Sequence, residues 1–328
     1  MADSAWIPSS MSIPNFSGEA NRHKPKVAVL VPCYNEALTI AEVISSFRDA
    51  LPDAAIYVYD NNSSDGTDMV ARQGGAIVRT ERRQGKGSVV RRMFSDIEAD
   101  IYVMVDGDAT YDASVAPRLV DELIAGPNDM VNVARAAAQA GAYRSGHAWG
   151  NRMLTALVQY IFGNATSDML SGYKAFSRRY VKSFPSGSRG FEIETELVVH
   201  ALELSMPISE LVAPYKERPV GSQSKLRTYR DGLRILFLIG YLVKEERPLV
   251  FFSLIAAALA ALALALGTSV TLEYLATGLV PRLPTAVLAV GLMLSSLLAV
   301  SCGFILDTVT RGRREAKLLA YLRYPAVR

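Results

Sequence analysis

The amino-acid sequence predicts an α/β domain with a mostly parallel sheet, followed by interfacial helices and two transmembrane helices. From residue 26 onwards, short apolar runs rich in β-branched and aromatic residues alternate with stretches of helical spacing. That alternation is typical of parallel strands joined by helices. Near residue 250 it gives way to two long apolar runs without charge. The 328 residues therefore predict one large globular domain joined to a membrane anchor.

The first strand is expected at 27–31, where the sequence reads VAVLV. The next segment has apolar residues three and four positions apart, which predicts an amphipathic helix. Thr39 and Glu42 form a capping-box pattern at its start, and Pro52 marks its end.

Further strands are expected at 56–59, 76–78 and 101–105, separated by helices near 68–73 and 89–97. The strands are almost continuously apolar, so we expect helices on both faces of a doubly wound, Rossmann-like sheet. Ligands of such sheets bind beyond the carboxyl ends of the strands. The residues that directly follow each strand are therefore the candidates for a site.

Two apolar runs, 249–272 and 285–306, are each long enough to cross a bilayer. Basic residues flank the pair on its outer sides, whereas the short connection at 273–284 carries only Arg282. This asymmetry predicts a multi-pass protein of the cytoplasmic membrane whose globular domain faces the cytoplasm. The expected divisions are a disordered N-terminal tail at 1–25, a globular α/β domain at 26–228, an interfacial amphipathic helix at 229–247, a transmembrane hairpin at 248–307 and a basic cytoplasmic tail at 308–328.

The net charge of +3 is concentrated beside the apolar runs, which indicates attraction to a membrane surface and not to nucleic acid. The two cysteines, Cys33 and Cys302, fall in different divisions of the chain and are not expected to pair, which suits a reducing cytoplasm. Nothing in the sequence excludes a homo-oligomer.

Polar loops follow three of the predicted strands, at 32–36, 60–67 and 106–108. Asp106 and Asp108 lie one residue apart and could share a hard cation, Mg²⁺ or Mn²⁺ in preference to zinc. An Asp-x-Asp occurs roughly once by chance in a chain of this length, and a simple turn is the alternative. The position after a fully apolar strand favours the metal.

Asp60 directly follows its strand, and its carboxylate could accept a hydrogen bond from a nucleobase. The alternative is an Asx-turn, a reading that by itself also explains Asn62 and its neighbours. Lys86 stands at the start of a predicted helix, where a phosphate would be favoured. The spacing around it matches neither a Walker A loop nor a dinucleotide fingerprint.

Taken in order, these loops resemble the family-2 glycosyltransferases of GT-A fold, through 31–36 (VPCYNE), 60–67, 85–87 (GKG) and 106–108 (DGD). Later segments resemble the dolichyl- and polyprenyl-phosphate sugar synthases within that family, at 167–174, 191–197 and 216–226. Two departures stand out in these segments. Tyr173-Lys174 replaces an aromatic-Arg pair, and Gln223 is an extra residue that leaves the register of the acceptor loop open.

The resemblance implies a hexosyltransferase that moves a sugar, with inversion, from a nucleotide sugar to polyprenyl or dolichyl phosphate. UDP is favoured over GDP because Asp60 suits uracil. The metal ligands would be Asp106 and Asp108, and the catalytic residues Asp108 and Asp168. The donor would contact Pro32, Tyr34, Asn35, Glu36, Asp60, Asn62, Lys86, Asp106, Gly107 and Asp108, and the acceptor phosphate Arg135, Arg218, Ser224 and Lys225.

Two other functions stay open at this stage. A glycosyltransferase acting on a saccharide or glycolipid hydroxyl would need Asp168 or a neighbouring carboxylate as a general base. A membrane-anchored scaffold without catalysis would not need the acidic set at all. The basic residues near 225 could also serve only to reach lipid headgroups.

Overall fold

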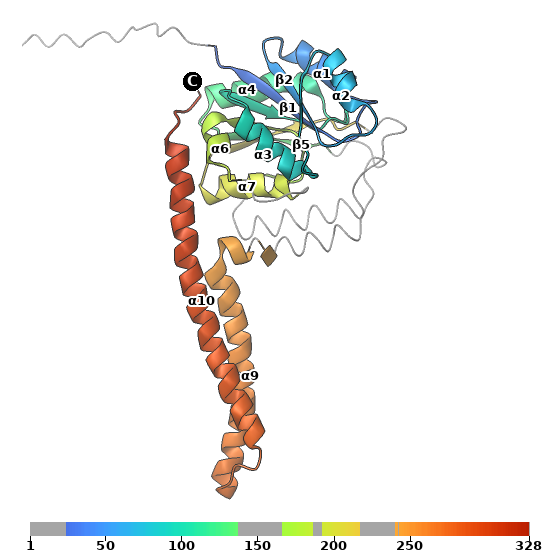
Figure 1. Ribbon diagram of the computed structural model, residues 1–328. Helices are drawn as coiled ribbons and strands as arrows, with labels where there is room; N and C mark the ends of the chain where they lie inside the picture. Colours follow the sequence, from blue (N-terminus) through green and yellow to red (C-terminus); the bar gives the residue numbers. More distant parts are fainter. Residues whose placement is uncertain (1–23, 137–165, 186–191, 217–239, 242, 328) are drawn as a thin grey trace, which may run out of the picture.

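A computed structural model describes residues 24–136, 166–185, 192–216, 240–241 and 243–327 (Figure 1). In these residues seven strands form one sheet of order β3-β2-β1-β4-β6-β5-β7. The strands are β1 (Val27–Cys33), β2 (Ala55–Asp60), β3 (Ile77–Thr80), β4 (Ile101–Met104), β5 (Met130–Arg135), β6 (Lys174–Ser177) and β7 (Ile208–Ala213).

The sheet is mostly parallel, as the alternation of strands and helices predicts. β1 pairs in parallel with both β2 and β4, and β5 pairs in parallel with β7. β6 is the exception, because it lies antiparallel between β4 and β5. All four of its residues are buried, so its sequence does not indicate that this strand runs antiparallel to its neighbours.

Helices cover both faces of the sheet (Figure 1). Along β1, Ala28 and Leu30 belong to the core under α3, α6 and α7, whereas Val29 and Val31 belong to the core under α1, α2 and α4. This period of two places one apolar core on each side of the sheet. The helices are α1 (Ile40–Ala50), α2 (Thr67–Gln73), α3 (Lys86–Asp96), η1 (Ala113–Val115), α4 (Ala116–Ala125), α6 (Arg178–Ser183) and α7 (Ile193–Glu203).

The predicted capping box at the start of α1 is wrong. Thr39 makes no side-chain cap, and its buried hydroxyl instead donates to the carbonyl oxygen of Gly107, 2.6 Å away. A buried hydroxyl needs a partner, and the loop after β4 supplies one that sequence spacing could not reveal. The first turn of α1 is thereby fastened to the Asp106-Gly107-Asp108 loop.

Two long apolar helices, α9 (Pro248–Thr277) and α10 (Leu283–Leu322), form a hairpin that projects from the domain (Figure 1). They contact each other through small residues seven positions apart, the spacing of a helix pair packed at a shallow angle. Their remaining large apolar side chains are mostly exposed, unlike those of a core helix. The hairpin therefore indicates membrane association. The buried contact residues are Ala256, Ala263 and Val270 on α9, and Ala289, Ser296 and Gly303 on α10.

The segment expected to be a basic tail is mostly helical, because α10 continues unbroken to Leu322. Its last turns run along the globular domain (Figure 1). The Tyr321 hydroxyl donates to Asp129 Oδ2 at 2.7 Å, and Lys317 Nζ lies 2.5 Å from Glu203 Oε2. The hairpin and the globular domain are thus joined by side-chain bonds as well as by the chain.

Candidate active site

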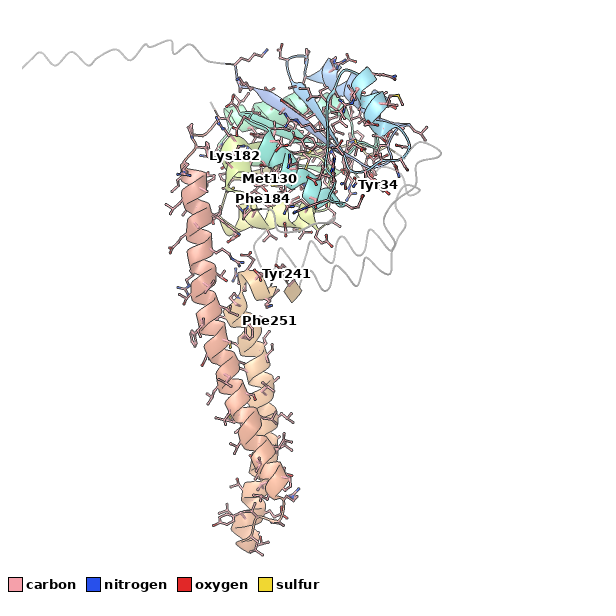
Figure 2. All side chains as sticks on the ribbon, in the orientation of Figure 1. Tyr34, Met130, Lys182, Phe184, Tyr241 and Phe251 are labelled. Carbon is pink, nitrogen blue, oxygen red and sulfur yellow. The ribbon has the colours of Figure 1, made fainter. Side chains whose placement is uncertain are left out.

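The loop that follows β1 is fastened to the loop that follows β2. Asn35 Oδ1 accepts a hydrogen bond from the backbone amide of Ser64 at 2.8 Å, and the Asn35 amide donates to Ser63 Oγ at 2.8 Å. Asn35 has a φ of 52°, a left-handed conformation that asparagine tolerates better than most residues. Next to it Tyr34 is 38% exposed and lies on the flank of the domain away from α10 (Figure 2).

Asp60 ends β2 and is 6% exposed. Its Oδ2 accepts from the amide of Ser63 at 3.2 Å, three residues on, whereas the expected Asx-turn would reach two residues on. Within the described residues its other oxygen, Oδ1, is buried without a hydrogen-bond partner. A buried acceptor left unpaired costs about 1–3 kcal/mol, and an N–H group of a bound ligand would remove that cost.

The amide side chains after Asp60 hold the loop that leads into α3. Asn61 Nδ2 donates to the carbonyl of Glu81 at 2.8 Å, and its Oδ1 accepts from the amide of Gly85 at 2.7 Å. Asn62, predicted as a donor contact, donates to the carbonyl of Arg82 at 3.0 Å. In this structure it shapes the loop that positions Lys86.

The Asp106-Gly107-Asp108 loop begins two residues beyond β4, on the same edge of the sheet as Asp60. β1 lies between β2 and β4, so the two strand ends are separated by two strand spacings, about 10 Å. Asp108 is 3% exposed, and its Oδ1 accepts from the Thr110 hydroxyl at 2.6 Å. A Cβ at Gly107 would lie 2.7 Å from Cys33 Sγ, so the loop has room only for glycine there.

Lys86 is the first residue of α3 and lies between two carboxylates. Its Nζ is 2.5 Å from Asp106 Oδ1 and 2.5 Å from Glu194 Oε1 on α7. Burial alone would lower the pKa of Lys86, but the two carboxylates outweigh burial and raise it above its usual value. The ammonium is therefore charged at neutral pH.

Gly172 lies directly against the Asp106 carboxylate. A Cβ at this position would come within 2.6 Å of Asp106 Cγ, a distance that real side chains do not adopt. The amide of Gly172 donates to the Tyr111 hydroxyl at 2.8 Å, which fixes the backbone at this point. Glycine at 172 therefore creates the space that the Asp106 carboxylate occupies.

Asp168, on the loop that precedes β6, is paired with Arg135 at the end of β5. Arg135 Nε donates to Asp168 Oδ2 at 2.6 Å, and Nη2 donates to Oδ1 at 2.8 Å. The same guanidinium lies 5.4 Å from the ring centroid of Tyr215. The predicted catalytic aspartate and the predicted phosphate-binding arginine thus form one bidentate pair.

Lys174, where the resemblance leads one to expect arginine, is buried and supports the loop that carries Asp168. Its Nζ donates to Asn132 Oδ1 at 2.5 Å and to the carbonyl of Met169 at 3.3 Å. Asn132 in turn donates to the carbonyl of Asp168 at 3.0 Å. Burial lowers the pKa of Lys174 to about 8, partly opposed by the charge of Asp168.

The residues present fit a hard divalent cation. Within the described part of the chain no three histidine, cysteine or acidic residues form a metal cluster. Asp106 and Asp108 nevertheless offer two carboxylates, and Asp106 already stabilises a positive charge at Lys86. Magnesium-type sites commonly use one or two carboxylates and take their other ligands from substrate phosphates and water.

The structure thus brings most predicted donor residues to one edge of the sheet, at the ends of β1, β2 and β4. The contacts of Glu194 and Gly172 to this edge escape sequence reasoning, which identifies only a glutamate-rich helix and a glycine-containing motif. Three predicted phosphate contacts, Arg218, Ser224 and Lys225, lie outside the described residues.

Known proteins share this fold and parts of this sequence. Residues 28–184 match the model of glycosyl transferase family 2. Glycosyltransferase AglJ of Haloferax volcanii is 33% identical over 290 residues, which cover 88% of this chain and 95% of that protein. A dolichyl-phosphate hexose transferase of the same organism is 26% identical over 67% of this chain and 95% of its own length.

Among solved structures, Mycobacterium tuberculosis glucosyl-3-phosphoglycerate synthase, crystallised with Mn²⁺, UDP-glucose and phosphoglyceric acid, superposes with a TM-score of 0.56. It is 23% identical and covers 67% of this chain and 79% of its own. The fold and the donor edge define a glycosyltransferase that uses a nucleotide sugar. The chain belongs to glycosyltransferase family 2, and the GT-A fold implied by the sequence motifs is confirmed.

Proposed function

We propose that the protein transfers a hexose from a UDP-sugar to a polyprenyl or dolichyl phosphate, with inversion at the anomeric carbon. The unpaired Oδ1 of Asp60 is compatible with a uridine donor, because it could accept the N3–H of uracil. The structural neighbour that binds UDP-glucose also supports a uridine donor.

The observation that carries the lipid acceptor is the bonded connection between the catalytic domain and the hairpin. α10 has 40 residues and is about 60 Å long, roughly twice the thickness of the bilayer core. Its far end is bonded to Asp129 of the catalytic domain. This connection would keep the donor site close to the membrane surface, an arrangement that a water-soluble acceptor does not need. The related dolichyl-phosphate hexose transferase adds support.

The Arg135–Asp168 pair favours a phosphate over a hydroxyl as the attacking group. Both oxygens of Asp168 accept hydrogen bonds from a guanidinium, and a carboxylate so engaged is a poor proton acceptor. A phosphate monoester is largely ionised near neutral pH and needs no strong base. Asp168 would therefore orient Arg135, and Arg135 would hold the acceptor phosphate together with Arg218, Ser224 and Lys225.

On the donor side, Asp60 and the 34–36 loop would hold the base. Asp106 and Asp108 would hold Mg²⁺ or Mn²⁺, which neutralises the charge that develops on the departing nucleoside diphosphate. Gly107 would help to fix the positions of the two aspartates, because its backbone packs closely against Cys33. These residues position the diphosphate for in-line displacement by the acceptor oxygen.

We further propose that the catalytic domain faces the cytoplasm and that α9 and α10 both span the membrane. The part of α10 beyond 307 carries Arg311, Arg313, Arg314 and Lys317, whereas the connection between the helices carries one basic residue. That bias is typical of cytoplasmic flanks.

The test is transfer of radiolabelled hexose from a panel of UDP- and GDP-sugars to undecaprenyl or dolichyl phosphate by the purified full-length protein with Mn²⁺. We expect a labelled lipid that disappears with chelator and in Asp108→Asn. Polyprenol, which lacks the phosphate, is the matched control acceptor. Equal labelling of polyprenol would favour transfer to a hydroxyl, and no labelled lipid from any donor would overturn the proposal.

A further inference from the structure

The ammonium of Lys86 lies beside Asp106, so a metal ion would compete with it for the Asp106 carboxylate. Its side chain is 9% exposed, and its ammonium lies within 2.5 Å of both Asp106 and Glu194. A buried ammonium is costly unless it is paired and hydrogen-bonded. The negative charge of Asp106 is therefore balanced by the ammonium of Lys86.

Glu194 gives Lys86 a second partner. It is 5% exposed on the first turn of α7, and its Oε1 lies 2.5 Å from Lys86 Nζ. If Asp106 turned to a metal, Lys86 would still be paired with Glu194. Without Glu194, release of Asp106 would leave a buried charge without compensation, which is strongly unfavourable.

Asp106 itself has freedom to change partners. Its side chain is 30% exposed, in contrast to those of Lys86 and Glu194. Lys86 also stands at the first position of an 11-residue helix, where the helix dipole favours an anion. When Asp106 leaves, Lys86 is therefore in a suitable position to meet the diphosphate of the donor.

We propose that Lys86, held by Glu194, is a resident counter-cation of Asp106 that yields to metal and nucleoside diphosphate together. This inference rests on the proposed donor site. Metal alone must compete with the ammonium for Asp106 and binds weakly. When the diphosphate arrives with the metal, Lys86 exchanges Asp106 for phosphate oxygens, so the two ligands bind cooperatively.

A different reading is that the Lys86–Glu194 pair only ties α3 to α7. The two readings predict different changes in the affinity for metal alone when Lys86 is removed. Removal of a competing cation strengthens the binding of metal alone, whereas loss of a structural tie does not strengthen any binding.

The experiment is isothermal titration of the full-length protein in detergent with Mn²⁺ alone, and with UDP or GDP at saturating Mn²⁺. In Lys86→Met we expect Mn²⁺ alone to bind about tenfold more tightly, and the nucleotide about tenfold more weakly, than in wild type. In the isosteric Glu194→Gln variant we expect the nucleotide to bind more weakly than in wild type at saturating Mn²⁺. The control Lys182→Met removes a similarly buried lysine of α6, which pairs with Glu98 between α3 and β4, and should leave all affinities unchanged.

The failure of this inference is distinct from the failure of the proposed donor site. Wild-type protein that binds neither nucleotide with Mn²⁺ would overturn the donor site, and this inference with it. Nucleotide binding in wild type, with Lys86→Met binding Mn²⁺ no more tightly, would overturn only the role of Lys86.

Discussion

Replacement of Gly172 by alanine tests whether the position of Asp106 matters for catalysis. The new Cβ would lie 2.6 Å from Asp106 Cγ and 2.9 Å from Oδ1, with Oδ2 closer still. An ordinary contact is longer, so the carboxylate must move by roughly 1 Å, and a displacement of that size at a reacting group can cost about 100-fold in rate. The strain of overpacking is about 1–3 kcal/mol and should leave the fold intact.

The assay is kcat/KM for sugar transfer, with the melting temperature measured on the same sample. We expect Gly172→Ala to lose at least about 100-fold in kcat/KM while melting only a few degrees lower. Gly312→Ala is the matched control, because a Cβ there meets no atom within 4 Å and alanine favours the helix. A Gly172→Ala enzyme within about threefold of wild type would refute the argument that Asp106 must lie where the glycine leaves room.

Three further predictions concern the base, the hairpin and the dependence of stability on pH. Asp60→Asn should weaken UDP binding about tenfold or more in a calorimetric titration, because the hydrogen bond to a charged acceptor is lost; unchanged affinity would remove Asp60 from the base site. Gly303→Leu should lower the melting temperature, because even a Cβ there lies 3.1 Å from Phe252 Cβ, and an unchanged melting temperature would contradict the packing of α9 on α10. Burial lowers the pKa of His200 to about 3, so His200 stays neutral in the folded protein and its share of the stability is lost as pH falls below 6.5. The free energy of unfolding should fall by about 2 kcal/mol between pH 6.5 and 5 on this account. Denaturant unfolding of His200→Phe should not show this loss, and an equal dependence of the unfolding free energy on pH in both proteins would contradict the burial of a neutral His200.

The sequence predicts the donor half of the fold well, because its signals are local. β1 and β4 are apolar throughout and β2 is apolar up to Asp60, and each is followed by a polar loop, so both the parallel sheet and the edge carrying Asp60 and Asp106 follow from the sequence pattern. A structural role in the loop and the expected base contact are compatible at Asp60, since one carboxylate oxygen accepts from Ser63 and the other is left unpaired.

The features that sequence reasoning missed depend on long-range contacts. Lys86 and Glu194 are 108 positions apart, and nothing in the sequence near either residue indicates that they pair. The capping-box pattern at Thr39 failed for the same reason, because a carbonyl 68 positions away competes for its hydroxyl. The basic residues beyond 307 suggest a tail, yet they belong to α10, where Lys317 pairs with Glu203 of α7 and Arg313 pairs with Glu245 just ahead of α9.

The most direct test of transfer to a lipid phosphate is mass spectrometry of the lipid formed from polyprenyl phosphate and the preferred nucleotide sugar. We expect one product, whose mass equals that of polyprenyl phosphate plus a single hexose residue, with the phosphate retained between sugar and lipid. A product formed equally well from polyprenol, or one bearing several sugars, would contradict it.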